Sequence, residues 1–326
     1  MPKQAVLLLA HGTPETVDDI PEYLRNVVSG RPLPEHVIEE IKHRYSLIGR
    51  SPLTDITLEQ GKLVEAELAM EGIDAQVYVG MRNWKPYIPD VVRKMRADGV
   101  EEAAVLCLAP QNSRTSVGLY KRAVQAEAGA LKIDFTEGWA YDPLLADAFA
   151  ERLRAAEEKL TSELGSPVPV LFTAHSVPCR TIQTPAANEG QPRHWPGEGV
   201  DPYAQEAKHT AELVAARVSG IPKWWFAFQS QGASGGPWIG PTVEDTLTSI
   251  AAEGVKTLLL QPIGFLCDHV EILYDVDIAF KEYAKSLAIQ LERPESLNTS
   301  LTLARSVASL AIRGLRRLQE NEPPLA

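Results

Sequence analysis

Short runs of consecutive apolar residues alternate along this chain with longer segments in which apolar residues recur every three or four positions. Near-continuous apolar strands that alternate with helices are typical of parallel sheets covered on both faces. The longer segments, such as 57–72 and 142–164, predict amphipathic helices that pack on these sheets. The predicted strands are 5–10, 75–80, 103–109, 169–174, 224–229 and 257–262.

The second half of the chain repeats features of the first. The pattern V-L-x-x-A-H-x-x-P occurs at 6–14 and again at 170–178. In each half, a helix that begins at a proline then ends in Gly-Val and leads into an apolar strand that ends in proline. Because both echoes come in the same order, we expect a duplicated lobe with pseudo-twofold symmetry.

The length of 326 residues exceeds the usual size of one domain and predicts two lobes of roughly 150 residues each. We predict an α/β fold of two Rossmann-like lobes, each a doubly wound parallel sheet, that span 1–165 and 166–326. The C-terminal helix could pack back on the first lobe.

The composition narrows the class of partner. The formal net charge is −11, which argues against nucleic acid or anionic lipid bound through a basic surface. The three cysteines, without a C-x-x-C pair, cannot form a disulfide framework or a four-thiolate cluster. The apolar stretch near the N-terminus is too short for a signal peptide or a membrane span. These features favour a cytoplasmic enzyme that acts on a small molecule.

The predicted site is the cleft between the lobes, because ligands of open α/β sheets bind outside the carboxyl ends of the strands. Segment 179–202 predicts a long loop, either a lid over this cleft or a solvated insertion. The glycine-rich turn 229–241 lacks the nucleotide-binding patterns and is expected to shape a cleft wall. There Trp238 either offers an apolar face to a flat ligand or packs as an ordinary anchor. The loops expected to line the cleft are 11–16, 110–116, 175–182, 230–241 and 263–271.

Two histidines and two carboxylates are the candidates for chemistry. His11 and His175 follow equivalent predicted strands, and two imidazoles that face one cleft suit metal binding. Glu271 and Asp275 are spaced i and i+4, so both fall on one face near the start of a predicted helix. These acids either carry cations inward or simply complement the helix dipole.

Three separated segments resemble the signature segments of the ferrochelatases: AHSVP at 174–178, FQSQGASGGPWIGP at 228–241 and GFLCDHVEILYD at 264–275. The resemblance extends to LLLAHGTPET, RYSLIGRSPL and LAPQNSRTSVGLY, so it spans nearly the whole chain in order. Ferrochelatases insert Fe²⁺ into a porphyrin, bound between two Rossmann-like lobes, to form haem. The resemblance therefore implies a lyase of haem biosynthesis.

By this resemblance, His175 is the histidine at the metal-insertion centre and Glu271 is the carboxylate opposite it. Asp275 corresponds to an outer position of a metal relay. Ala279 stands where a further acidic residue is often found, which leaves the relay incomplete unless Asp277 replaces that acid.

His11 departs from the pattern of many bacterial members, which carry tyrosine or an apolar residue there. Smaller cobalt and sirohydrochlorin chelatases carry a metal-binding histidine at this place, so His11 is expected either to contact metal or only to pack. Other matched positions lie near porphyrin edges in the family, and arginines suit propionates. These candidates for substrate binding are Arg44, Ser51 and Tyr120, with Arg25 and Arg31 as further arginines within reach of propionates. Helix 17–29 is expected to form a charged lip of the cleft.

We expect no resident cofactor, since Fe²⁺ is a substrate and the family's iron–sulfur cluster requires four cysteines. The expected partners are a porphyrin and Fe²⁺, with no nucleic acid and no stable membrane insertion, and the expected state is a monomer or weak dimer. Alternatives are a cobaltochelatase or sirohydrochlorin-type chelatase, and a non-catalytic carrier of haem or porphyrin. The choice between protoporphyrin IX and coproporphyrin III stays open at this point.

Overall fold

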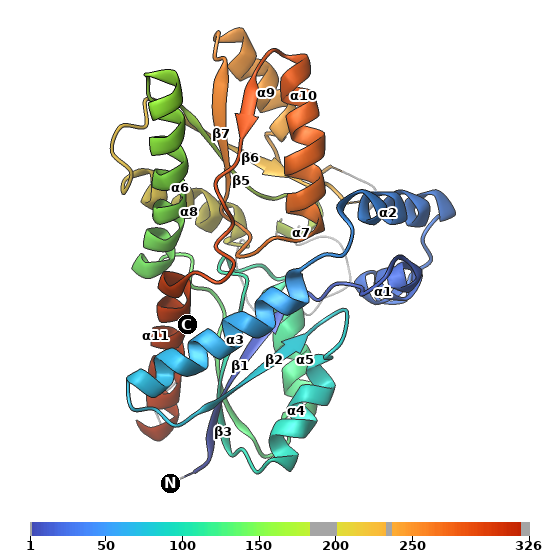
Figure 1. The fold of residues 1–326 in the computed structure, drawn as a ribbon. Helices are drawn as coiled ribbons and strands as arrows, with labels where there is room; N and C mark the ends of the chain where they lie inside the picture. Colours follow the sequence, from blue (N-terminus) through green and yellow to red (C-terminus); the bar gives the residue numbers. More distant parts are fainter. Residues whose placement is uncertain (1, 183–200, 233–236, 321–326) are drawn as a thin grey trace, which may run out of the picture.

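The structure is a computed structural model that describes residues 2–182, 201–232 and 237–320. Two four-stranded parallel sheets form its framework (Figure 1). The first contains β1 (Gln4–Ala10), β2 (Gln76–Met81), β3 (Glu102–Cys107) and β4 (Lys132–Thr136), in the order β2-β1-β3-β4. The second contains β5 (Val170–His175), β6 (Trp224–Gln229), β7 (Thr257–Pro262) and β8 (Gln290–Glu292), in the order β6-β5-β7-β8.

The two sheets share one strand order, which confirms the predicted duplication of a Rossmann-like lobe. All six predicted strands are present, and β4 and β8 are added at the edges. The helices up to residue 128 are η1 (Val17–Asp19, 3₁₀), α1 (Ile20–Val27), α2 (Glu35–Ile48), α3 (Leu53–Met70), α4 (Ile88–Ala97) and α5 (Val117–Ala128). The remaining helices are α6 (Pro143–Leu164), α7 (Cys179–Ile182), α8 (Tyr203–Ala215), α9 (Val243–Ala252), the π-helix η2 (Glu271–Phe280), α10 (Lys281–Ser286) and α11 (Leu301–Glu320).

Both faces of each sheet are buried, which explains the unbroken apolar runs. In β1, Val6 and Leu8 belong to a core that continues into the second lobe, whereas Leu7 and Leu9 pack against α4 and α5 on the other face. In β5, Phe172 joins the shared core and Leu171 packs against α9 and η2. The shared core makes the two lobes one packed unit around the cleft.

The chain crosses between the lobes more than once. α11 packs on β3, β4 and α3 of the first lobe, although it comes last in the sequence (Figure 1). Arg317 of α11 holds this position through a buried ion pair with Asp134 of β4, with Nη2 and Oδ1 2.6 Å apart. α6 contacts β7 and α8 of the second lobe. The boundary between 165 and 166 stays a prediction.

The lip of the cleft is formed by α1 and α2, which project from the first lobe towards the second (Figure 1). The predicted helix at 17–29 is a 3₁₀ turn followed by α1. Tyr23, Tyr45 and Trp84 form a small apolar cluster under the lip, and Val270 of the second lobe packs against it. The lip is thereby fixed over the start of η2.

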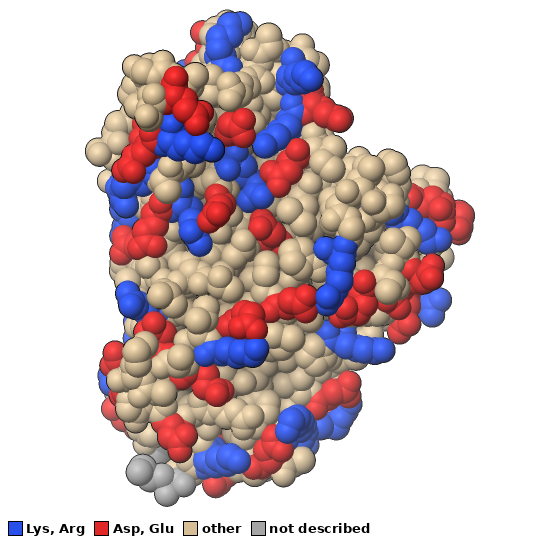
Figure 2. All heavy atoms as spheres, viewed as in Figure 1, with Lys and Arg blue, Asp and Glu red and all other residues tan. Residues whose placement is uncertain are grey.

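The surface carries acidic and basic side chains in alternation. On the face in Figure 2, blue and red groups are interspersed and no broad basic area forms. This distribution agrees with the net charge of −11. Among the described residues, no helix combines the length and the apolar character needed to cross a membrane.

Candidate active site

A cavity of about 320 Å³ opens where the carboxyl ends of the two sheets face each other. Its walls come from all five segments that the sequence predicts to line the cleft. Most of the predicted loop 179–202 and part of the turn 229–241 lie outside the described residues, so the structure does not test the lid. The five segments contribute to the wall His11 to Thr13; Gln111, Ser113, Thr115 and Ser116; His175 to Pro178; Trp238; and Gly264 to Cys267 with His269 to Glu271.

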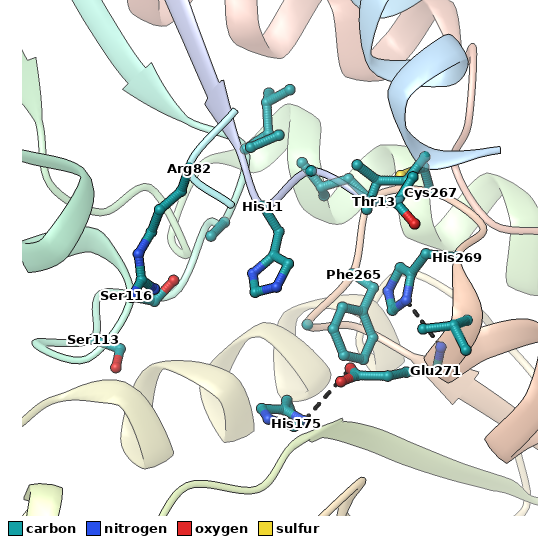
Figure 3. A pocket seen from close by; sticks show the side chains of 18 of the residues that line it. His11, Thr13, Arg82, Ser113, Ser116, His175, Phe265, Cys267, His269 and Glu271 are labelled. Carbon is teal, nitrogen blue, oxygen red and sulfur yellow. Dashed lines mark hydrogen bonds and ion pairs between the residues drawn. The ribbon is translucent and has the colours of Figure 1, made fainter. Parts of the chain in front are cut away.

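His175 is the last residue of β5 and points into the cavity from the second lobe (Figure 3). The hydroxyl of Tyr203 donates a hydrogen bond of 2.8 Å to the His175 carbonyl oxygen and so holds the strand end. Trp238 and Phe265 flank the imidazole, with ring centroids 6.4 Å and 6.2 Å away. Burial lowers the pKa of His175 to about 4, which keeps the ring neutral near pH 7. A neutral imidazole can bind metal or accept a proton.

Glu271 begins η2 and meets His175 across the floor of the cavity (Figure 3). Its Oε2 lies 3.6 Å from Nδ1 of His175, and that nitrogen has no hydrogen-bond partner among the described residues. Burial raises the pKa of Glu271 to about 7, and Arg44 opposes this only in part. The pair is therefore a neutral base beside a carboxyl group that titrates near neutrality, which is the combination that proton transfer requires.

His11 follows β1 and faces the same cavity from the first lobe. The turn after it needs Gly12, whose φ is +84° and where an added Cβ would lie 2.9 Å from the backbone nitrogen of Trp84. The Asn83 amide nitrogen lies 3.1 Å from Nε2 of His11, and burial lowers the pKa of His11 to about 3. His11 is a neutral imidazole on the wall opposite His175.

Sequence reasoning missed a third cavity histidine, His269. The backbone N–H of Glu271 donates to Nδ1 of His269 over 3.1 Å, so this ring fixes the start of η2. Burial lowers the pKa of His269 to about 3. His269 lies inside the segment 264–275 that carries the resemblance, and that position was the signal available for it.

Asp275 lies behind Glu271 and lines a second cavity on the outer side of η2. Arg44 Nη1 lies 3.2 Å from Oδ1 of Asp275, and the Ser230 hydroxyl donates to Oδ2 over 2.5 Å. Burial and the neighbouring Glu271 raise the pKa of Asp275 to about 6. The sequence predicts a helix here, and the structure has a π-helix on which Glu271 and Asp275 line separate cavities.

Asp277 was the candidate to replace the acidic residue that is often found at the position of Ala279. Both carboxylate oxygens of Asp277 accept hydrogen bonds from Arg293, at 2.9 Å and 2.8 Å, and the side chain lines neither cavity. Ala279 itself lines the outer cavity. Asp277 is therefore a structural partner of Arg293, and the outer cavity retains Asp275 as its acid on η2.

The residues expected to contact the porphyrin, Arg44, Ser51, Tyr120 and Trp238, do not all line one cavity. Tyr120 and Trp238 line the main cavity. Arg44 lines the outer cavity instead, where it also pairs with Glu40. Ser51 is 1% exposed and lines neither cavity. Sequence reasoning missed Arg82, which lines the main cavity directly after β2 and was accessible to the same strand-end argument that found His11.

Metal-binding side chains do not form a closed cage. Within the described parts of the chain, no three His, Cys, Asp or Glu side chains lie close enough to hold one ion. Cys107 and Cys267 are buried, and burial keeps their thiols protonated by raising the pKa of each. The cavity thus presents the His175–Glu271 pair on one wall and the imidazole of His11 on the other.

Comparison with known proteins places this geometry in a family. The ferrochelatase family model matches residues 3–315. A ferrochelatase of Acidobacterium capsulatum is 61% identical over 323 residues, which cover 99% of this chain and 98% of that protein. A coproporphyrin III ferrochelatase of a Geobacillus species is 32% identical over 321 residues, covering 96% and 98%.

The solved structures agree at the level of the fold. The sirohydrochlorin chelatase SirB of Bacillus subtilis subspecies spizizenii aligns with a TM-score of 0.53 at 12% identity, covering 98% of this chain and 96% of SirB. Identity this low supports only a common two-lobed fold. The family model and the two relatives cover nearly the full length, and on that basis the chain belongs to the ferrochelatase family.

Proposed function

We propose that this protein inserts Fe²⁺ into a porphyrin held in the main cavity and releases haem, with His175 and Glu271 as the reacting pair. The observation that carries the proposal is the 3.6 Å contact between a neutral imidazole and a carboxyl group inside an aromatic cleft. The family of the chain supports the same reaction.

The chemistry requires two protons to leave the pyrrole nitrogens as the metal enters. Nδ1 of His175 has no hydrogen bond to a described residue, so it can accept the first proton without losing such a contact. The Glu271 carboxylate can bind the incoming cation and accept the second proton, because its pKa of about 7 permits both states. Two protons leave for each Fe²⁺ that enters, so the charge balances.

A flat porphyrin hides its nitrogens from the metal, so the enzyme must bend the macrocycle towards its product-like shape. The two walls suit this task because each is built on a buried strand end and one core joins the lobes. Trp238 and Phe265 offer apolar contact beside His175. We propose that contact with both walls supplies the energy for bending.

We propose that iron reaches Glu271 from the outer cavity by way of Asp275. The two acids lie on one π-helix that separates the cavities, and each lines one of them. Arg44 occupies the Asp275 carboxylate in this structure, so an arriving cation has to displace it. In this exchange the divalent cation replaces the guanidinium as the positive partner of the Asp275 carboxylate.

The pH dependence of the reaction follows from the same groups. We expect kcat/KM for Fe²⁺ to rise with pH through a midpoint near 7, because Glu271 binds metal only after losing its proton. Because the pKa of His175 is about 4, its imidazole is neutral over this pH range and its titration adds no second step to the pH profile near neutrality. Anaerobic rates between pH 5.5 and 8.5 measure this profile, and a rate that falls as pH rises through 7 would contradict it.

His11 is proposed to contact the iron of the product from the opposite wall. In His11→Tyr a phenol replaces the neutral imidazole, so the visible spectrum of bound haem should shift by a change of axial ligand. The measurement is the absorption spectrum of each protein saturated with haem, in both oxidation states. Identical spectra would leave His11 with a packing role alone.

The activity itself is tested with purified protein under anaerobic conditions. Fe²⁺ and Co²⁺ are each offered with protoporphyrin IX, coproporphyrin III and sirohydrochlorin, and the metalloporphyrin spectrum is followed. We expect Fe²⁺ insertion into a porphyrin. Turnover confined to Co²⁺ or to sirohydrochlorin would favour the alternative chelatase, and porphyrin binding without any insertion would favour a carrier.

We propose that the enzyme works without an iron–sulfur cluster or other resident cofactor, because its three cysteines include two buried thiols with raised pKa values. We also propose a cytoplasmic protein that is a monomer or weak dimer, with no nucleic-acid partner and no stable insertion in a membrane. Sedimentation and iron analysis of the purified protein test the state of assembly and the absence of a cluster.

A further inference from the structure

Arg82 is a cation at the first-lobe end of the main cavity. Its position is fixed by the backbone, since its N–H donates to the Ala10 carbonyl oxygen over 2.9 Å at the end of β1. Its side chain reaches away from the Glu271 side of the cavity, and the guanidinium lies beside Ser116 (Figure 3). Burial is the main cause of the lowered pKa of His11, and Arg82 is close enough to lower that pKa further.

No described acidic side chain forms an ion pair with this guanidinium. None of the ion pairs among residues 2–182, 201–232 and 237–320 involves Arg82. Burial is the largest influence on the pKa of Arg82 and lowers it. The charged or titratable groups that also act on this pKa are Tyr120, Arg122 and Tyr23, and none of them is a carboxylate. A partly buried arginine without a counter-ion is unfavourable in the empty protein and favours an anion from the ligand.

The start of α5 adds a second attraction for an anion at the same place. Ser116 precedes α5, and its side chain does not cap the helix. The first turn of α5 contains no acidic residue, so no side chain of that turn opposes the positive end of the helix dipole. Ser113, Thr115 and Ser116 line the cavity there with hydroxyl groups. These hydroxyls and the guanidinium together match the donors that a carboxylate accepts.

We infer that Arg82 and the first turn of α5 form a carboxylate subsite that binds a propionate of the porphyrin, an inference that rests on the proposed function. The subsite also indicates the substrate class. Coproporphyrin III carries one propionate on each of its four rings, so one reaches Arg82 in any rotation of the macrocycle. Protoporphyrin IX carries propionates on only two of its four rings, so half of the rotations would leave Arg82 unpaired. The subsite therefore favours coproporphyrin III.

The test compares a porphyrin acid with its ester. Binding of coproporphyrin III and of its tetramethyl ester is measured without iron, by fluorescence in one detergent, for wild type, Arg82→Met, Arg82→Lys and Arg93→Met. We expect Arg82→Met to weaken binding of the acid about tenfold or more and to leave the ester unchanged. Arg82→Lys should retain most of the affinity. Arg93 is the matched control, since it is an exposed arginine on α4 that pairs with Asp90 and Glu127 away from the cavity.

Two results would overturn the subsite: equal affinity of wild type and Arg82→Met for the acid, or an equal loss for acid and ester. Unchanged ester binding also shows that the cleft of the variant is folded. In steady-state assays of iron insertion, KM for coproporphyrin III should rise in Arg82→Met while kcat stays within about twofold.

The substrate preference is tested by the ratio of the affinity for coproporphyrin III to the affinity for protoporphyrin IX. This ratio should exceed one in wild type and fall in Arg82→Met, and a ratio that Arg82→Met leaves unchanged would refute the substrate preference. Wild type that binds the acid but never inserts iron would refute the proposed function and leave the subsite standing.

Discussion

Replacing His175 with alanine is expected to lower kcat for iron insertion by about 10²- to 10⁴-fold, the range that a general base contributes. The variant loses the nitrogen that faces Glu271 at 3.6 Å and has no other partner among the described residues. Porphyrin binding should change little, because the walls of the cavity stay in place. The measurement is anaerobic insertion of Fe²⁺ at saturating porphyrin, followed by absorbance.

His209→Ala is the matched control for this change. His209 on α8 also pairs with a carboxylate, Glu212, at 3.4 Å, but it lies outside the main cavity. The control should keep the wild-type rate. Circular dichroism and thermal unfolding should show that His175→Ala is folded, and a folded variant with near-normal kcat would remove His175 from the reaction.

Glu271→Gln is expected to lower turnover by about 10²-fold or more, because the amide keeps the shape of the side chain but neither binds a cation strongly nor accepts a proton. The rise in kcat/KM through pH 7 should vanish with it, since Glu271 is the group that titrates there. Rates of Glu271→Gln between pH 5.5 and 8.5 measure both effects. Glu212→Gln, from the exposed pair on α8, is the control.

The same substitution has a consequence for stability. Burial raises the pKa of Glu271 from 4.5 to about 7, so the folded state holds its proton more tightly than the unfolded state does. This contribution to the free energy of unfolding is complete below pH 4.5 and is lost as pH rises through 7. Urea unfolding at several pH values measures this contribution. Between pH 4.5 and about 7, the free energy of unfolding should fall less in Glu271→Gln than in wild type. An identical pH dependence in both proteins would argue against a buried, titrating Glu271.

Local patterns in the sequence were sufficient to predict three strands of each sheet, and the edge strands β4 and β8 were missed. Strands buried on both faces, such as β1 and β5, are unbroken apolar runs, and the repeated A-H placed a histidine at the end of each. Because carboxyl ends of parallel strands meet at one edge, the convergence of His11 and His175 on one cleft followed. The resemblance to ferrochelatases is confirmed by the family model.

The features that sequence reasoning missed depend on contacts between distant segments. The absence of a counter-ion at Arg82 depends on which side chains surround it, and no local pattern encodes that. Arg44 reaches Asp275 only because the lip crosses to the second lobe. The π-helical form of η2 was not expected either, because π-helices are rare and the sequence pattern predicts only a helix.

The central claim is that His175 and Glu271 act as one unit on the metal, and a double-mutant cycle tests it most directly. Single-turnover rates of Fe²⁺ insertion are measured for wild type, His175→Ala, Glu271→Gln and the double variant, all with porphyrin bound. The account predicts that each single change is severe and that the double variant is hardly slower than the slower single one. Two mild single effects, or losses that multiply fully in the double variant, would contradict it.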